Sequence, residues 1–456
     1  MNDISGLYMS QSGSMEFSKL LDQVQAYLSE NYKELMVEGG AKNPQQTKAY
    51  IRQYLSEQRL SVDGMPREQT VNRLYREMAE YSFLTPYLNF EIRDVEGIEI
   101  CAWDNVWISY SNGTEKQSEE HFFSPEHARN VIIRLLHQSG ISLDNTKPLA
   151  IGHLGKNIRI TVDGGGGTLD DDVGVSVSIR FVNPNHLSCE DLIRNGTLTP
   201  EMMGFLVAAY QYGASMVIAG KTNSGKTTLM SDIMARAVPD DKKLITIEYE
   251  DREFDLIKRD GRGRPLNKVL HLCTRESEKP ELAITAQRLV EFSMTMNPAY
   301  FCLSEIKGGE AFATMGASES GHPTITTTHA SSAEDIPNRL VPLASLASNL
   351  SEKTLYFLMA RAFPILVFAR KNEDGKRRIA QICESVYEGG RIRVVPLWLW
   401  RTEYNEKAGG KTVVHGRFEK VHNISETLRQ KLRENDIPES VLRSFLTEEG
   451  KEGISA

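Results

Sequence analysis

The sequence predicts an α/β protein whose second half forms a mostly parallel sheet with helices on both faces. Three observations support this expectation. Short apolar segments alternate with helix-compatible stretches after residue 198, a glycine-rich turn directly follows the first of these segments, and the region before residue 184 has a different, alternating strand pattern. With 456 residues, the chain is too long for one ordinary core and is expected to form two or three domains.

Composition narrows the classes of protein to consider. The formal net charge is −8, and acidic and basic residues are interspersed, so we expect no direct binding of nucleic acid. The cysteines form no C-x-x-C pair, which predicts reduced thiols in a cytoplasmic protein rather than a zinc site. No segment has the pattern of a secretion signal or a membrane span, so any association with a membrane is expected to occur through partners.

The first part of the chain divides into two predicted regions. Residues 1–90 are charged and helix-prone, with apolar residues at three- and four-residue spacing, which predicts an amphipathic helical region. Residues 91–183 contain short alternating strands around one helix, Pro125–Ser139, which predicts an α+β N-terminal domain. If two of these strands pair as a hairpin, Arg159 and Arg180 project from its polar side. On spacing alone, the simpler interpretation is two solvated arginines.

A linker and a second α/β domain follow. Residues 184–198 are polar, which predicts a linker. The capping pattern Ser188-x-x-Asp191, and Thr199-Pro200 as a cap with proline in the first helical turn, predict two helix starts. Residues 199–420 are expected to form a RecA-like domain, and residues 421–456 a small helical tail that begins near Ser425. The apolar strand candidates of the α/β domain are Met216–Ala219, Leu244–Ile247, Tyr300–Leu303, Thr324–Thr328 and Pro364–Phe368.

The turn after the first of these strands carries the pattern Gly220-x-x-x-x-Gly225-Lys226-Thr227, and a helix-compatible segment follows it. Strand, turn and helix in this order are the context that a P-loop requires. Its glycines let backbone N–H groups surround phosphates, Lys226 reaches the outer phosphates, and Thr227 offers a hydroxyl to Mg²⁺. The sequence therefore predicts a nucleoside triphosphate site formed by Gly220, Lys221, Thr222, Asn223, Ser224, Gly225, Lys226, Thr227 and Thr228.

Two carboxylates end apolar strands downstream of this turn. Glu248 closes the segment LITIE, and Glu305 closes YFCLSE. A carboxylate in such a position can hold Mg²⁺ or polarise the water that attacks the γ-phosphate, so Thr227, Glu248 and Glu305 are the predicted metal site. His329, at the end of TITTTH, could hydrogen-bond a phosphate oxygen. Three more acids follow Glu248 and are each more simply solvated loop residues: Glu250, Asp251 and Glu253.

Four segments of this chain occur in the order and spacing of four motifs of the secretion traffic ATPases. The chain resembles that family between Gln69 and Tyr387. Gly220–Thr227 is similar to their Walker A motif, Thr246–Glu248 to their acidic box, Ser304–Ala311 to Walker B, and Gly321–Ala330 to their histidine box. Two upstream blocks resemble the Tad-type, CpaF-like pilus branch: Val95–Tyr110 and Cys189–Leu198.

This resemblance implies a homohexameric ring that binds ATP with Mg²⁺ between two domains and converts hydrolysis into domain movement. The ring would lie at the inner face of the cell membrane and drive a membrane-embedded platform protein of a pilus, secretion or conjugation machine. Lys307 departs from the family pattern because it stands in place of an arginine, and Thr295 and Asn297 replace basic residues. The catalytic residues implied by the resemblance are Glu305, Glu248, Lys226, Arg159, Arg180 and His329.

A RecA-like DNA translocase or helicase is the alternative from another class. It predicts basic loops that face a central pore and no histidine box. The candidate loop residues are Lys258, Arg259, Arg262, Arg264 and Lys268.

Overall fold

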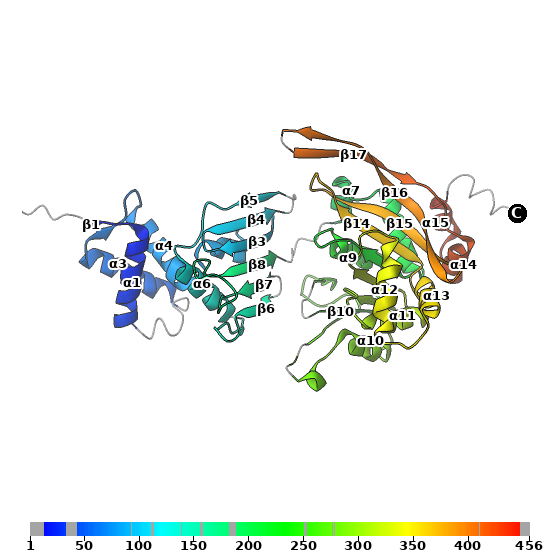
Figure 1. Ribbon diagram of the computed structural model, residues 1–456, viewed down its shortest axis with the longest axis horizontal. Helices are drawn as coiled ribbons and strands as arrows, with labels where there is room; N and C mark the ends of the chain where they lie inside the picture. Colours follow the sequence, from blue (N-terminus) through cyan, green and yellow to red (C-terminus); the bar gives the residue numbers. More distant parts are fainter. Residues whose placement is uncertain are drawn as a thin grey trace, which may run out of the picture. The chain divides into compact units, whose positions relative to one another are not determined.

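The computed structural model describes residues 13–446 except 33–42, 93, 111–113, 138, 156–157, 182–187, 250–252, 276, 278 and 410. The chain divides into two compact units, Met1–Val182 and Asn183–Ala456, and Figure 1 colours them along the sequence. Part of the predicted linker and the acids Glu250 and Asp251 lie outside the described residues.

The first unit begins with helices that share a core of their own. The apolar residues of α1 (Phe17–Asn31), α3 (Pro44–Glu57) and α4 (Arg67–Ala79) recur at three- and four-residue spacing, and they meet in one buried cluster. The short elements η2 (Ser82–Leu84) and α5 (Thr85–Leu88) lead from these helices to the sheet. A helical region therefore precedes the sheet, as predicted. The two-residue strands β1 (Gly13–Ser14) and β2 (Leu60–Ser61) pair with each other in parallel.

An antiparallel sheet with the strand order β5-β4-β3-β8-β7-β6 forms the rest of the first unit. Helix α6 (Pro125–His137) covers one face and shares its buried residues with the inward side chains of the strands. Sequence patterning predicted four of the strands but not β5 and β6, which lie at the two edges of the sheet. The strands are β3 (Val95–Ala102), β4 (Asn105–Tyr110), β5 (Glu115–Gln117), β6 (Leu149–Leu154), β7 (Ile158–Asp163) and β8 (Ser176–Phe181).

The second unit is built on a nine-stranded sheet with the order β11-β10-β12-β13-β9-β14-β15-β16-β17. Neighbouring strands from β11 to β14 are parallel, and β14 to β17 pair antiparallel. The strands are β9 (Met216–Ala219), β10 (Leu244–Glu248), β11 (Val269–Cys273), β12 (Tyr300–Leu303), β13 (Thr324–Thr328), β14 (Ile365–Lys371), β15 (Arg377–Glu388), β16 (Arg391–Ala408) and β17 (Lys411–Lys420).

Helices cover both faces of this sheet, so its parallel strands are buried on both sides between two separate core clusters. This arrangement confirms the predicted α/β class. One cluster includes α7 (Cys189–Arg194), α8 (Pro200–Gln211), α9 (Lys226–Ala237), α14 (Glu426–Glu434) and α15 (Glu439–Ser444). The other includes α10 (Ala286–Met294), α11 (Glu310–Glu319), α12 (Asp335–Ser345) and α13 (Glu352–Ala362), and η3 (Pro280–Leu282) precedes α10.

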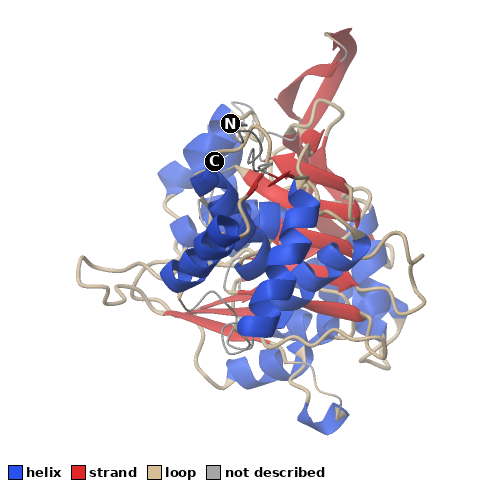
Figure 2. Cartoon of the chain, turned by 90° about the vertical axis from the view of Figure 1, so that its left-hand side faces the viewer, coloured by secondary structure: helices blue, strands red, loops and turns tan. Residues whose placement is uncertain are grey.

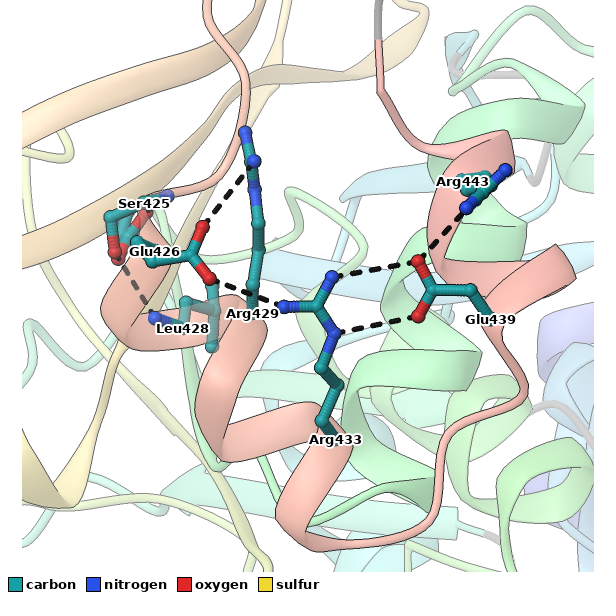
Figure 3. A network of polar contacts seen from close by, with 8 residues as sticks. Ser425, Glu426, Leu428, Arg429, Arg433, Glu439 and Arg443 are labelled. Carbon is teal, nitrogen blue, oxygen red and sulfur yellow. Dashed lines mark hydrogen bonds and ion pairs between the residues drawn. The ribbon is translucent and has the colours of Figure 1, made fainter. Parts of the chain in front are cut away.

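The predicted helix caps are present. Ser188 and Asp191 form the capping box of α7, and the Thr199 side chain accepts a hydrogen bond from the Met202 N–H at the start of α8. At the C-terminal end, Ser425 caps α14 by accepting from the Leu428 N–H at 3.1 Å. Figure 3 shows how Arg433 then ties α14 to α15, with Nη1 3.2 Å from Glu426 and Nε 3.4 Å from Glu439.

Strands β16 and β17 continue as a two-stranded hairpin beyond the point where β16 stops pairing with β15. The last pair between β15 and β16 is Gln381 with Leu399, whereas β16 and β17 stay paired as far as Ala408 with Lys411. The hairpin extends away from the other strands in both views (Figures 1 and 2). Since an isolated hairpin is marginally stable in water, its cross-strand pairs contribute to its order. These pairs are the ion pairs Arg401–Glu419 and Glu403–Arg417 and the hydrogen bond between His415 and Glu406.

Candidate active site

The predicted P-loop lies between β9 and α9. Strand β9 is fully buried, and the chain then turns at Gly220, where an added Cβ would collide with the carbonyl oxygen of Ala369. Gly225, with φ +88°, directly precedes α9, so a residue without a Cβ is needed at both ends of the turn. Asn223 is also left-handed, with φ 62°, which asparagine tolerates better than most residues. The strand, turn and helix stand in the order that the sequence predicts.

Lys226 lies folded over the loop. Its Nζ donates to the carbonyl oxygens of Gly220 and Lys221 at 3.0 and 3.1 Å, and the residue is 9% exposed. Ser224 is buried, and its hydroxyl has no hydrogen-bond partner among the described residues. Thr227 is half-buried in the first turn of α9. A helix N-terminus, an ammonium group and an unpaired hydroxyl together fit a phosphate chain, and the Thr227 hydroxyl would be the group to hold a Mg²⁺ ion bound with it.

Glu305 and His329 converge on the same loop from neighbouring strands. Glu305 follows β12, and its Oε2 lies 3.2 Å from the Nζ of Lys307. His329 follows β13, which lies between β12 and β9, and its Nδ1 contacts the carbonyl oxygen of Gly220 at 3.2 Å. The other ring nitrogen lies 2.9 Å from Glu305 Oε1, although the pair is not aligned as a hydrogen bond. The histidine therefore connects the carboxylate to the first residue of the P-loop.

Glu248 has a different environment from Glu305. Its carboxylate is 0% exposed, and both oxygens are occupied by neighbours. Oε1 accepts from the Thr246 hydroxyl at 2.8 Å and contacts His271 Nδ1 at 3.1 Å. Oε2 accepts from the backbone N–H groups of Glu253 and Phe254 at 2.6 and 3.0 Å. Glu248 thus joins β10, β11 and the loop after β10.

The predicted metal residues differ in their surroundings, because the carboxylate of Glu248 is enclosed by other donors whereas Thr227 and Glu305 are partly exposed. Within the described part of the chain, no group of three or more His, Cys, Asp or Glu side chains could hold a metal ion. Of the acids that follow Glu248, Glu253 contributes its backbone N–H, which donates a hydrogen bond to Glu248 Oε2. Glu305, which is close to the P-loop and partly exposed, is the better placed of the two strand-end carboxylates to act on a bound phosphate.

A second polar network, which sequence reasoning missed, stabilises the loop after Glu305. The Tyr249 hydroxyl donates to Glu310 Oε1 at 2.8 Å, and the same oxygen accepts from the backbone N–H groups of Lys307 and Gly308 at 2.6 and 2.7 Å. The Lys307 ammonium lies 4.3 Å from the centre of the Tyr249 ring. Burial and the adjacent Glu310 raise the pKa of Tyr249 well above its ordinary range, so the phenol remains a donor. The sequence signal was Glu310 in the first turn of a helix.

Arg159 and Arg180 lie in the first unit. They are directly opposite each other on β7 and β8, and both are exposed on the sheet face opposite α6. This confirms that the two strands pair as a hairpin with both arginines on its polar side. His153 pairs with Arg159 on the next strand, β6.

The basic loop that a DNA translocase would need is partly neutralised by nearby acids. Lys258 Nζ lies 2.6 Å from Asp240, and Arg264 Nε lies 2.8 Å from Asp260.

No helix among the residues that the structure describes is both long and apolar enough to cross a membrane.

Comparison with known proteins identifies the family. Residues 154–441 match the profile of the family described as type II/IV secretion system protein. A putative conjugal transfer protein of Mycobacterium tuberculosis is 24% identical over 332 residues, which are 71% of this chain and 90% of that protein. The type IV secretion system protein VirB11 of Brucella suis is 33% identical over 216 residues, which are 42% of this chain and 58% of that protein.

Among solved structures, the VirB11 ATPase of the Brucella suis type IV secretion system, in complex with sulphate, is 23% identical. The match covers 67% of this chain and 97% of that chain, with a TM-score of 0.34. The family profile spans more than half of the sequence and includes the P-loop, Glu305 and His329. The chain therefore belongs to the type II/IV secretion system protein family and is an ATPase of that family.

Proposed function

We propose that this protein is the motor that hydrolyses ATP to power a membrane-associated secretion, conjugation or pilus-assembly machine. The observation that carries the proposal is that His329 contacts the carbonyl of Gly220, the first residue of the P-loop, and at the same time lies 2.9 Å from the carboxylate of Glu305. A binding module that only holds nucleotide has no need of a carboxylate at this edge of the sheet. Family membership supports the secretion role.

In this proposal the residues of the loop divide the work of binding and hydrolysis. Lys226 compensates the charge of the outer phosphates, because its ammonium is already held at the mouth of the loop by two carbonyl groups. Mg²⁺, when bound through Thr227, supplies further compensation of phosphate charge. Glu305 polarises the attacking water, and His329 holds that carboxylate in line with the loop.

We further propose that the protein works as a homohexamer in which Arg159 and Arg180 reach the nucleotide from the N-terminal unit. Their opposed positions on β7 and β8 place two guanidinium groups at one point of an open sheet face. Such a pair suits charge that develops on a transferred phosphoryl group. The same proposal includes domain boundaries near residues 90, 184, 199 and 421. It also assigns the chain to the Tad-type, CpaF-like branch, which the blocks Val95–Tyr110 and Cys189–Leu198 support.

The proposed partner is the inner-membrane platform protein of the machine, and the proposed location is the cytoplasmic face of that membrane. An ATPase assay of the full chain tests this against the DNA translocase. Membranes that contain the platform protein should raise the turnover of ATP, whereas membranes from cells that lack it and single-stranded DNA should not. The Lys226→Ala protein, assayed with the same membranes, measures the contaminating ATPase activity. Stimulation by DNA alone would favour the translocase.

A further inference from the structure

An arginine from a distant part of the second unit holds the P-loop at its exposed corner. Arg377 is the first residue of β15, and its Nε donates to the carbonyl oxygen of Asn223 at 3.0 Å. Its Nη2 donates to the side-chain oxygen of the same asparagine at 2.7 Å. The aliphatic part of the side chain lies over Gly225, where an added Cβ would be 3.3 Å from Arg377 Cδ. One side chain thus covers the turn that precedes α9.

The contact acts on the peptide group that links Asn223 to Ser224 within the P-loop. The carbonyl of Asn223 and the N–H of Ser224 belong to one planar trans peptide, so a fixed carbonyl fixes the direction of that N–H. The Ser224 N–H donates to the Lys221 carbonyl at 3.3 Å, so this peptide group takes part in the hydrogen bond that closes the turn of the loop. Asn223 is left-handed, which is a conformation that a non-glycine residue holds only when its surroundings favour it.

The position of Arg377 in the sheet separates it from the hydrolytic residues. Glu305 and His329 approach the P-loop from β12 and β13, on one side of β9, whereas β14 and β15 lie on the other side. The hairpin that presents Arg377 is itself braced, because Arg378 forms a buried ion pair with Asp374 at 2.7 Å. A guanidinium that is held in advance loses little side-chain entropy when the loop binds its ligand.

We infer that Arg377 is a positioning residue that preorganises the P-loop for nucleotide by clamping Asn223. This inference rests on the proposal that ATP occupies the P-loop. The guanidinium acts through the backbone of the loop and lies away from Glu305, so its effect falls on the binding of ATP and ADP alike. Lysine cannot replace it, since the clamp uses two donors in the fixed geometry of the guanidinium fork.

The first experiment separates binding from chemistry in the full chain. Arg377→Ala and Arg377→Lys should each raise the dissociation constants of Mg²⁺-ATP and Mg²⁺-ADP by about tenfold or more, which is the usual effect of losing hydrogen bonds to a charged group. The value of kcat at saturating ATP should stay within about threefold of wild type. The matched control is Arg370→Ala, which removes an arginine of the same hairpin that contacts Asn372 and not the P-loop. Its nucleotide affinity should equal that of wild type.

A double-mutant cycle tests the contact itself. Asn223→Gly introduces glycine, which tolerates the left-handed backbone, and removes the side-chain oxygen that accepts the hydrogen bond from Arg377. Combined with Arg377→Ala, it should weaken nucleotide binding by clearly less than the product of the two single effects. Thermal melting of every variant shows that the comparison is made on folded protein.

Three results would overturn the inference. Wild-type affinity in Arg377→Ala, full rescue of affinity by Arg377→Lys, or independent effects of Arg377→Ala and Asn223→Gly would each show that the clamp does not set nucleotide binding. Failure of the underlying ATP assignment looks different, because Lys226→Ala would then bind both nucleotides as tightly as wild type.

Discussion

Two glutamates that end neighbouring strands of one sheet have opposite surroundings, and this difference decides what each can do. Glu305 is partly exposed and contacts Lys307 and His329 through its side chain alone. Glu248 is enclosed and receives hydrogen bonds from two backbone N–H groups of its own loop. A carboxylate that is saturated by internal donors has little capacity left for a metal ion or a water molecule. We therefore expect the two residues to fail in different ways when they are altered.

Glu305→Gln should lower the turnover of ATP by about 10²–10⁴-fold, because the amide has nearly the shape of the carboxylate but cannot polarise the attacking water. Binding of ATP should persist. Glu248→Gln is the comparison. Its amide group would face the two backbone N–H donors that now bind the carboxylate, so we expect a lower melting temperature for this variant. Turnover and melting measured on both proteins check the assignment. Normal turnover in Glu305→Gln with loss in Glu248→Gln would exchange the two roles.

Lys226→Ala should abolish measurable ATP turnover and weaken nucleotide binding. The ammonium is anchored to two loop carbonyls and is the group best placed to oppose the charge of the outer phosphates. Steady-state hydrolysis and equilibrium binding of ATP check this expectation. Lys242→Ala is the control, since Lys242 is an exposed lysine of the second unit that lies outside the P-loop. Hydrolysis within a few-fold of wild type in Lys226→Ala would remove the P-loop assignment.

At the scale of elements, helices α4 and α6 bury a polar contact between them. His127 on α6 is 10% exposed, and its Nε2 lies 3.6 Å from the carboxylate of the buried Glu77 on α4. Its Nδ1 accepts a hydrogen bond from the Phe123 N–H at 3.3 Å, which suits a neutral ring. Burial, together with the charge of Arg134, lowers the pKa of His127 to about 4. The helices therefore hold a histidine that resists protonation.

The buried His127 makes the stability of the first unit depend on pH, and the direction of that dependence follows from the lowered pKa. The unfolded chain binds a proton at His127 below about pH 6.5 and the folded chain only near pH 4, so the free energy of unfolding falls as the pH falls through this window. Between pH 7.5 and 5.0 the loss should be on the order of 1–2 kcal/mol, and His127→Gln should lack it. Glu77, whose pKa burial raises, acts with the opposite sign but is present in both proteins. Urea unfolding at both pH values measures the difference, and equal losses in the two proteins would contradict the prediction.

At the scale of the whole molecule, the proposed motor needs both units at its nucleotide site. Arg159→Ala or Arg180→Ala should reduce turnover far more than ATP binding, since arginines that stabilise a transferred phosphoryl group are worth about 10³–10⁵ in rate. Thr161→Ala is a matched control, because Thr161 is an exposed residue on the same strand and the same face. Hydrolysis and binding by the full-length variants provide the measurement. Full activity in a chain that begins near residue 185 would contradict the two-unit site.

The hexamer makes a further, physical prediction for the intact protein. If the sites are completed by more than one subunit, specific ATPase activity should rise with protein concentration as subunits associate. Analytical ultracentrifugation, run beside the ATPase assay, should show the two curves rising together. Constant specific activity in a monomeric sample would contradict the proposal of a shared site.

The sequence by itself determined the features that depend on a few neighbouring residues. Strands β9, β12 and β13 lie at the residues predicted for them, because a buried parallel strand is a short apolar or β-branched run between turns. The caps at Ser188 and Thr199 also follow from local hydrogen bonding. The P-loop belongs to the same class, since its glycines, lysine and threonine act within one turn.

Only the tertiary structure decided which distant residues meet at the site. The enclosure of Glu248, the contact of Tyr249 with Glu310 and the hold of Arg377 on Asn223 depend on the order of strands in the sheet. Edge strands such as β5 and β6 were also missed, because pairing with a neighbour, and not apolar periodicity, makes them strands. Local patterns fix elements within a few residues, whereas packing between elements selects the partners of polar side chains that are far apart in the chain.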